Sequence, residues 1–181
     1  SFLAIFQKIG GGYTISGSGM TFFKSQNTTH RITIETGTHP CFMTDWQQIF
    51  TVALTQHHGI STIHETVYEN RFGFTETLNL MGAKITTHTT CLGKKTCRFK
   101  NKDSIHSISI QGGTHLKSIQ IDIPDLRAGF SYVLAALIAN GDSEIGNLQY
   151  LDRGYENIYK QLQGLNANIQ LMDAPESLSL L

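Results

Sequence analysis

Four charged residues stand at corresponding places in two similar stretches of the sequence. The interval from Asp45 to Arg71 equals the interval from Arg127 to Arg153, and each residue lies close to the start of a helix-like stretch. A helix N-terminus favours anions, and a guanidinium group binds phosphate or carboxylate through two parallel hydrogen bonds. The pattern therefore predicts a pocket for a small phosphorylated or carboxylated molecule, with Asp125 as a further member.

Asp45 breaks the correspondence, because a carboxylate stands where the later stretch has Arg127. An acid that faces arginines can act as a general base on a substrate hydroxyl, although the arginines would lower its pKa. Thr44 and Asp45 are also good N-cap residues, so Asp45 could simply cap the helix that follows. Arg71 or Arg153 taken singly could equally be a surface ion pair. The functional interpretation depends on all four residues occupying one kind of position.

The elements that must position these residues form a repeat. Each copy has an apolar helix pattern ending at glycine, then a strand-like run, then a charged junction and an amphipathic helix pattern. The paired segments are 46–59 with 128–141, 60–67 with 143–151, and 75–85 with 157–169. The interval from Arg71 to Gly82 also equals the interval from Arg153 to Gly164. Two matched intervals with matched residue types indicate a true internal repeat.

The remaining segments complete the repeated unit. Alternating β-branched residues at 32–36 and 118–123 predict the strand that opens each copy. Segments 86–91 and 104–111 predict a closing hairpin, joined by the lysine-rich loop 93–102, which we expect to be an exposed excursion.

The chain therefore divides into units. Residues 2–16 resemble a second helix, its glycine end and a strand. We expect a partial first unit at 1–30, a second unit at 31–112, a third unit at 117–173 and a C-terminal tail at 174–181, with 1–173 forming one domain.

The helix pattern at 128–141 is apolar almost all round, which predicts a helix buried on every side. Buried helices inside and sheets outside satisfy this pattern. An ordinary doubly wound sheet does so less well, because its helices keep a polar outer stripe. The expected fold class is α/β, built from repeated βαβαββ units.

Composition excludes several classes of protein. Of 181 residues, 40% are hydrophobic, which is enough for a folded core. The 14 basic and 14 acidic residues cancel, so no net charge would attract nucleic acid or an acidic membrane surface. The longest apolar run, around Tyr132–Ala139, is too short to span a bilayer. The first residues have an apolar stretch but no basic segment, which argues against a signal peptide.

Cysteine and histidine usage points to a cytoplasmic protein without a metal. The three cysteines form no CxxC pair, and an odd count favours a reducing compartment. None of the eight histidines pairs at HExxH or zinc-finger spacing, so His57–His58 and the Thr/His run 86–90 are expected to be surface residues. We expect no metal and no cofactor.

Four blocks carry a resemblance to a known family. They are HPCFMTDWQQIF (39–50), ETVYENRF (65–72), DLRAGFSYVLAALIANG (125–141) and LDRGYENIYKQLQGLNANI (151–169). In this order and spacing they resemble the UDP-N-acetylglucosamine enolpyruvyl transferases, within the EPSP synthase-like superfamily. The resemblance extends over nearly the whole chain.

The resemblance implies a reaction and a fold. Members of the family transfer the enolpyruvyl group of phosphoenolpyruvate to the 3-hydroxyl of UDP-N-acetylglucosamine and release phosphate, the first committed step of peptidoglycan synthesis. They have two inside-out α/β barrel domains, each of three βαβαββ units, with the active site in the cleft between them. No nucleic acid or membrane partner is implied.

The resemblance also assigns roles to residues. Asp45 matches the residue that binds the sugar hydroxyl and is the favoured base, and Val67 matches a backbone contact to the sugar nucleotide. Arg127 and Arg153 match arginines that hold phosphoenolpyruvate. The remaining two matches, Arg71 and Asp125, are a further active-site arginine and an acid beside the reacting centre.

Several family features have no counterpart in the matched part. The cysteine that protonates phosphoenolpyruvate and much of the nucleotide-binding surface belong to the other domain. We therefore expect this chain to be inactive alone, to require that companion domain, and to self-associate through its uncovered face. Cys41, Cys91 and Cys97 match none of the family's functional positions and are interpreted as structural or incidental.

Two alternatives remain. The chain could belong to the sister transferase of the shikimate pathway, which shares the fold and phosphoenolpyruvate, although ETVYENRF and LDRGYENI favour the cell-wall enzyme. It could also be a non-catalytic binding module that has kept the fold and lost the chemistry.

Overall fold

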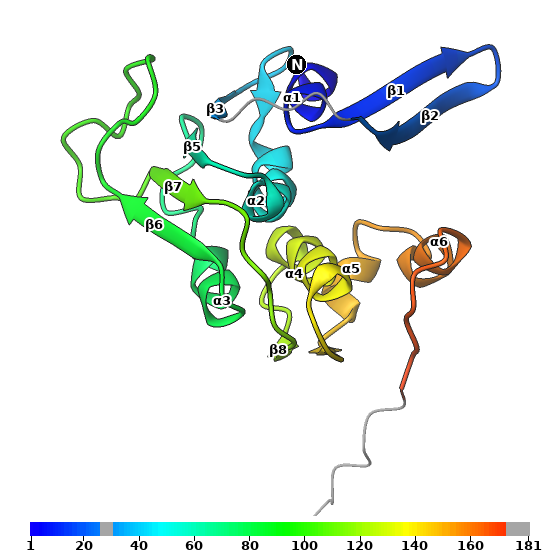
Figure 1. Cartoon of the computed structure of the whole chain (residues 1–181). Coiled ribbons are helices and arrows are strands. Elements are labelled where there is room, and N and C mark those ends of the chain that lie inside the picture. Colours follow the sequence, from blue (N-terminus) through cyan, green and yellow to red (C-terminus); the bar gives the residue numbers. More distant parts are fainter. Residues whose placement is uncertain (26–30, 173–181) are drawn as a thin grey trace, which may run out of the picture.

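The computed structural model describes residues 1–25 and 31–172 (Figure 1). The predicted tail at 174–181 lies outside the described residues. The elements are, in chain order, α1 (Phe2–Lys8), β1 (Gly11–Ser16), β2 (Gly19–Lys24), β3 (Thr33–Gly37), β4 (Phe42–Met43), the 3₁₀ turn η1 (Thr44–Trp46), α2 (Gln47–Gln56), β5 (Ile60–His64), α3 (Phe74–Leu80), β6 (Lys84–His88), β7 (Ser107–Gln111), β8 (Gln120–Asp122), α4 (Leu126–Ile138), β9 (Glu144–Gly146), α5 (Gln149–Asp152) and α6 (Ile158–Gly164). In the described part of the chain, no helix has both the length and the apolar character that crossing a bilayer requires.

The largest sheet belongs to the predicted second unit. Its strand order is β4-β3-β5-β7-β6, with β3 parallel to β4 and β5, and β7 antiparallel to β5 and β6. The closing hairpin predicted at 86–91 and 104–111 is confirmed by the β6–β7 pairing, in which Ile85 lies opposite Ile110. Parallel β3 and β5 end on the same edge of this sheet, where a ligand site is expected.

The main hydrophobic core lies between this sheet and the helices. Phe50 and Leu54 of α2 are buried with Ile63 and Ile108 of the sheet, and Ala135 of α4 belongs to the same cluster. Each large apolar side chain buried in this way contributes about 1.5–3 kcal/mol. Helix α2 therefore lies between the sheet and α4, as expected for a helix buried on several sides (Figure 1).

The predicted third unit is smaller. Strands β8 and β9 form a parallel pair, and α4 packs a second core around Ile123, Val133, Leu151 and Leu162. The prediction of a continuous strand over 143–151 was wrong, because β9 ends at Gly146 and residues 149–152 form α5. Asn147 has a positive φ of 59°, which turns the chain and lets buried Leu151 reach the second core from a helix.

The N-terminal residues confirm the predicted helix and strand at 2–16. Helix α1 packs against the main core, while β1 and β2 form a hairpin that projects away from the body of the molecule (Figure 1). Every residue of β2 is exposed, including the large apolar side chains Met20, Phe22 and Phe23.

The mixed α/β class is confirmed, whereas the closed barrel stays a prediction. The described strands form three separate sheets of two, five and two strands. The expectation that loop 93–102 is simply an exposed excursion was wrong. Cys97 and Phe99 are buried in it, so the loop is anchored to the body by two of its side chains.

Candidate active site

The site begins at the turn that follows β4. Asp45 lies in η1, and Arg71 lies in the turn that leads into α3. The Arg71 guanidinium donates one hydrogen bond to Asp45 Oδ1 at 2.7 Å and another to Thr44 Oγ1 at 2.7 Å. The Arg71 side chain is only 9% exposed, whereas that of Asp45 is 60% exposed. The arginine is therefore fixed by its surroundings, and the carboxylate projects from it towards solvent.

A buried carboxylate organises the backbone behind this pair. Glu65, which follows β5, is fully buried and accepts hydrogen bonds from the hydroxyls of Thr36 and Thr44 at 2.8 and 2.7 Å. The same carboxylate accepts the backbone N–H groups of Val67 and Tyr68 at 2.7 and 3.1 Å. These four bonds satisfy a charge that would otherwise be costly to bury. Glu65 thus joins the ends of β3 and β5 to the turn that carries Asp45.

The second arginine comes from the third unit. Arg127, near the N-terminus of α4, donates from Nε to Asp45 Oδ1 at 3.1 Å. Asp125 is the N-cap of α4, because its Oδ1 accepts the backbone N–H groups of Arg127 and Ala128 at 2.8 and 3.0 Å. The alternative that Asp45 caps a helix is not supported, since no side-chain cap bond is found at the start of η1 or α2. Asp125 therefore caps its own helix, α4, whereas Asp45 caps neither η1 nor α2.

The charge of Asp45 is stabilised where it lies. Partial burial raises its pKa, but the hydrogen bonds and charges of Arg71 and Arg127 outweigh this and lower the pKa below its ordinary value. Asp45 is therefore ionised at neutral pH. A carboxylate in this state can accept a hydrogen bond from a substrate hydroxyl, at a reduced basicity.

Arg153 makes no hydrogen bond or ion pair with this group in the structure as described. Its guanidinium lies 5.5 Å from the ring centroid of Tyr150, and among the described residues it forms no ion pair. Tyr155, two residues further on, has its pKa raised by burial and by the negative charge of Asp45. Tyr155 packs on Phe130 of α4 with ring centroids 4.6 Å apart. The third unit thus brings the aromatic side chain of Tyr155 within electrostatic range of Asp45.

A pocket of about 380 Å³ opens beside Val67, at the ends of β3 and β5. The pocket is lined by Thr36, Gly37, Thr38, Cys41, Thr66, Val67, Lys95 and Arg98. Arg98 donates to the carbonyl of Val67 and lies 3.6 Å from Glu69. Lys95 donates its backbone N–H to Glu35 Oε1 at 2.6 Å. Lys95 and Arg98, two cationic residues of loop 93–102, therefore line the same pocket as Val67, whose backbone is a predicted ligand contact.

The structure thus brings together part of what the sequence predicted. Asp45 is in direct contact with both Arg71 and Arg127, and Val67 lies three residues after the end of β5 and four residues before Arg71. Sequence reasoning missed Glu65, Lys95 and Arg98. A signal was present for the last two, because the lysine-rich loop is the most basic segment of the chain.

Comparison with known proteins supports the fold and the spacing. Residues 1–162 match the profile of the family described as EPSP synthase (3-phosphoshikimate 1-carboxyvinyltransferase). The chain is 50% identical over 173 residues to a UDP-N-acetylglucosamine 1-carboxyvinyltransferase of Protochlamydia amoebophila, covering 96% of this chain and 37% of that protein. It is 47% identical over 172 residues to the protein of the same name from Chlamydia abortus, covering 94% and 39%. The chain therefore spans about two fifths of the length of these curated relatives.

A solved structure has the same fold. The enolpyruvyl transferase NikO from Streptomyces tendae superposes with a TM-score of 0.74 at 22% identity, over 96% of this chain and 37% of that chain. At this identity the likeness concerns the fold. It agrees with the mixed α/β architecture described above.

Proposed function

The chain belongs to the EPSP synthase family, and from that premise we propose that it is the arginine-bearing part of an enolpyruvyl transferase whose acceptor is UDP-N-acetylglucosamine. The donor is phosphoenolpyruvate, whose enolpyruvyl group moves to the 3-hydroxyl of the sugar while phosphate leaves. The product belongs to peptidoglycan synthesis, and hence to cell-wall biogenesis, cell shape and cell division in the cytoplasm. The acceptor is proposed from the names of relatives at 44–50% identity.

The observation that carries the proposal is the carboxylate of Asp45 held between two arginines. In the described residues both recorded contacts, from Arg71 and Arg127, fall on Oδ1, which leaves Oδ2 available to the sugar hydroxyl. Asp45 accepts the hydroxyl proton as the sugar oxygen bonds to C2 of phosphoenolpyruvate and C3 takes a proton from the companion domain. The double bond forms again when C3 loses a proton and the bond between C2 and the phosphate oxygen breaks, which releases phosphate. The same arginines keep Asp45 ionised and provide positive charge for the carboxylate and phosphate of the donor.

The remaining site residues extend this arrangement. Arg153 has no ion-pair partner among the described residues and supplies a further guanidinium for phosphoenolpyruvate. Asp125 acts by fixing the N-terminus of α4, and with it the backbone of Arg127. Asp125 is thus proposed as a positioning residue beside the reacting centre.

The pocket beside Val67 is proposed to hold the sugar nucleotide. The backbone of Val67 is fixed from both sides, because Glu65 accepts its N–H and Arg98 donates to its carbonyl. A nucleoside diphosphate sugar carries two negative phosphates, and Lys95 and Arg98 on the rim would pair with them. The volume of about 380 Å³ is within the range of small-molecule sites.

The complete enzyme is proposed to have the two-barrel architecture that the resemblance implies. The relatives extend well beyond the part matched here, and the companion domain would supply the other wall of the cleft. The exposed apolar hairpin of β1 and β2 is then a surface for the rest of the enzyme or for a second copy of the chain. We expect the 181 residues alone to be inactive.

A second candidate is the shikimate-pathway reaction, favoured by the name of the matching family profile. The two reactions share the donor and differ in the acceptor. The test compares phosphate release from phosphoenolpyruvate with UDP-N-acetylglucosamine and with shikimate 3-phosphate, using the 181-residue chain and the same chain joined to its companion domain. We expect turnover only from the joined protein with the sugar nucleotide. Turnover with shikimate 3-phosphate would reverse the choice of acceptor, and turnover by the 181 residues alone would remove the need for a companion.

A further inference from the structure

Four side chains that commonly bind metals meet behind the Val67 pocket. They are His64, Cys91, Cys97 and His106, and one ligand atom from each lies within 4.8 Å of all the others. We propose that these four residues form a tetrahedral Cys₂His₂ site for a divalent zinc ion, which anchors loop 93–102 to the sheet.

The separations between the ligand atoms are those of a zinc site. A tetrahedral Zn²⁺ with Zn–S bonds of about 2.3 Å and Zn–N bonds of about 2.0–2.1 Å holds two sulfurs about 3.8 Å apart, and a sulfur and a nitrogen about 3.5–3.6 Å apart. Cys91 Sγ lies 3.6 Å from Cys97 Sγ and 3.5 Å from His106 Nε2. The other separations are at most 4.8 Å, up to about 1.2–1.5 Å longer than an ideal edge that includes a nitrogen, and rotation of a side chain would shorten them.

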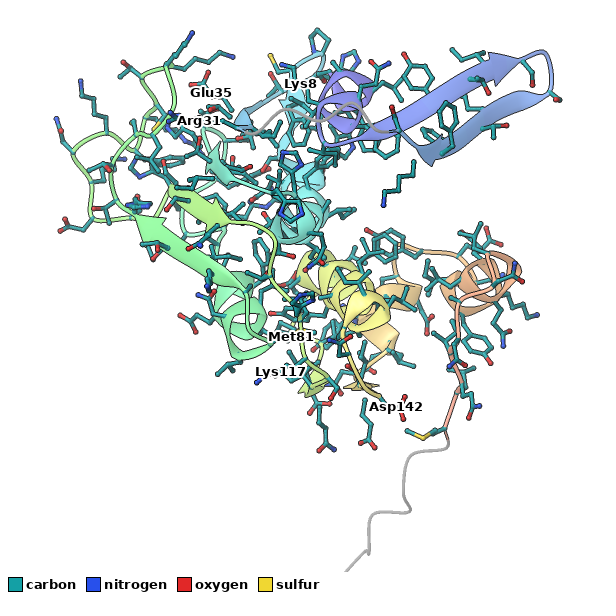
Figure 2. The ribbon with its side chains drawn as sticks, in the orientation of Figure 1. Lys8, Arg31, Glu35, Met81, Lys117 and Asp142 are labelled. Carbon is teal, nitrogen blue, oxygen red and sulfur yellow. The ribbon has the colours of Figure 1, made fainter. Side chains whose placement is uncertain are left out.

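The histidine surroundings also match those of metal ligands. A zinc-bound histidine uses one ring nitrogen for the metal and donates the other N–H to a carboxylate or a backbone carbonyl. His106 Nδ1 lies 2.8 Å from the carbonyl oxygen of Ser104, so the N–H belongs on Nδ1 and Nε2 presents its lone pair to Cys91. His64 Nδ1 lies 3.5 Å from Glu35 Oε1, which leaves Nε2 for the metal. Glu35 points from β3 towards the loop (Figure 2).

His64 gives an independent reason to expect a ligand. Its side chain is fully buried. Nε2 has no hydrogen-bond partner among the described residues, and Nδ1 has only the long 3.5 Å contact with Glu35. A buried imidazole nitrogen without a partner is costly, and a metal bond to Nε2 would remove much of that cost. His106 is fully buried too, and its ring centroid lies 5.7 Å from that of His64.

The fold explains why the four residues meet. His64 ends β5 and lies opposite Ser107, the first residue of β7, so His106 directly precedes the paired position. Cys91 and Cys97 come from the connection between β6 and β7, which folds back over these two strand ends. At Gly93 a side chain would collide with those of Glu35 and His64, so glycine allows the loop to approach closely.

A disulfide between the two cysteines explains less of the arrangement. It would satisfy Cys91 and Cys97, but it would leave Nε2 of His64 without a partner among the described residues and would not explain the contacts that Ser104 and Glu35 make with the two histidines. The reducing compartment expected from the cysteine count also disfavours it. Zinc accounts for all of these features at once.

The site would fix the two cations at the rim of the pocket. Lys95 and Arg98 lie between and just after the two cysteines, and Glu35 accepts the backbone N–H of Lys95. Pinning Cys91 and Cys97 to the sheet therefore holds Arg98 against the carbonyl of Val67. Without the metal, buried Cys97 and Phe99, the Arg98–Glu69 ion pair and a few hydrogen bonds would hold this loop.

The test measures zinc bound to the 181-residue chain, purified with reduced thiols and passed into zinc-free buffer. We expect about one zinc per chain, and Co²⁺ substituted for zinc should give the visible bands of a tetrahedral site with thiolate-to-metal charge transfer. The double variant Cys91→Ser, Cys97→Ser should lose the metal and the charge-transfer band. Cys41→Ser, which removes an exposed cysteine outside the cluster, should keep both. Glu35→Gln should weaken zinc binding about 10- to 100-fold.

Each outcome decides the proposal. Less than about a tenth of an equivalent of zinc on the folded, reduced chain would overturn it. Equal zinc on the double variant and the unmutated chain would also overturn it, as would a Cys91–Cys97 disulfide in a chain that does not take up zinc. If the double variant does not fold, the Co²⁺ spectrum of the unmutated chain decides, because the absence of charge transfer excludes thiolate ligands.

Discussion

Two groups of side chains near the end of β5, the Asp45 cluster and the His64 cluster, differ in their exposure to solvent. In the first, Asp45 and the two arginines form an ionised group, with Asp45 60% exposed and Arg127 57% exposed. In the second, His64 and His106 are fully buried beside two cysteines. Exposed charges can change partners when a substrate arrives, whereas buried ligands have to be satisfied inside the protein. The contrast fits the roles proposed for them, chemistry for the first cluster and structure for the second.

Glu65 marks the boundary between the two clusters. It follows His64 in the chain, and its carboxylate faces the other way, towards Thr36, Thr44 and the backbone of Val67. A single turn after β5 thus separates a buried set of ligands from the support of an exposed site. Damage to one cluster should leave the other largely intact, and this is what the following experiments measure.

The largest expected effect concerns Asp45 in the complete enzyme. Asp45→Ala removes the proposed base and should lower kcat by about 10²–10⁴-fold, with the zinc content unchanged. Steady-state phosphate release and metal analysis on the same preparation measure both quantities. Near-parental turnover would show that Asp45 is not the base.

A matched control for this substitution is Asp142→Ala. Asp142 is exposed and lies near the start of β9, away from Glu35 in the view of Figure 2. It should leave kcat within about twofold of the parent, as expected of an exposed residue outside the reacting group. A large loss in both variants would indicate a general effect of removing an acid.

The next effect is on stability and belongs to the buried cluster. At a free zinc concentration about 100 times the dissociation constant, binding should raise the free energy of unfolding by about 2.7 kcal/mol. Chemical denaturation with zinc and with a chelator measures the difference. The Asp45→Ala chain should gain as much as the parent, and loss of the gain in that variant would show that the two clusters are coupled.

A smaller difference separates the two arginines. Arg71→Ala removes hydrogen bonds to Thr44 and Asp45 from a side chain only 9% exposed and should cost about 1.5–3 kcal/mol. Arg127→Ala removes an exposed contact and should cost less than about 1 kcal/mol. Urea denaturation of both variants measures the costs. Equal costs would show that burial does not distinguish the two contacts.

The smallest effect is a dependence of stability on pH. The pKa of Asp45 is lowered in the folded chain, so its ion pairs contribute fully above the ordinary aspartate pKa of about 3.9 and are lost as the pH falls through the folded value. The contribution of such exposed pairs is about 0–1 kcal/mol and decreases at high salt. Unfolding measured against pH for the parent and Asp45→Asn should converge in acid. A difference that persists or grows below that range would contradict the sign.

Much of the fold was accessible from local pattern. Helical periodicity located α2, α4, α3 and α6, and strand alternation located β3 and β8, with ends shifted by several residues. The strand predicted over 143–151 was wrong beyond Gly146, because packing of Leu151 against the second core favours a short helix there. The closed barrel was not decided, since it requires sheets that the described residues do not complete.

For the candidate site, too, the sequence predicted one part and only the tertiary structure decided the other. The equal spacing within the repeat determined that Asp45, Arg71 and Arg127 would stand at helix-opening turns, because a repeated sequence places equivalent residues at equivalent points of a repeated fold. Only the tertiary structure decided that Asp125 caps α4 while Asp45 does not cap a helix, since both residue types suit either role. Only the tertiary structure joined His64 and His106 to Cys91 and Cys97. Their spacing along the chain follows no metal motif, and they meet because strands β5 and β7 pair and the loop folds back across them.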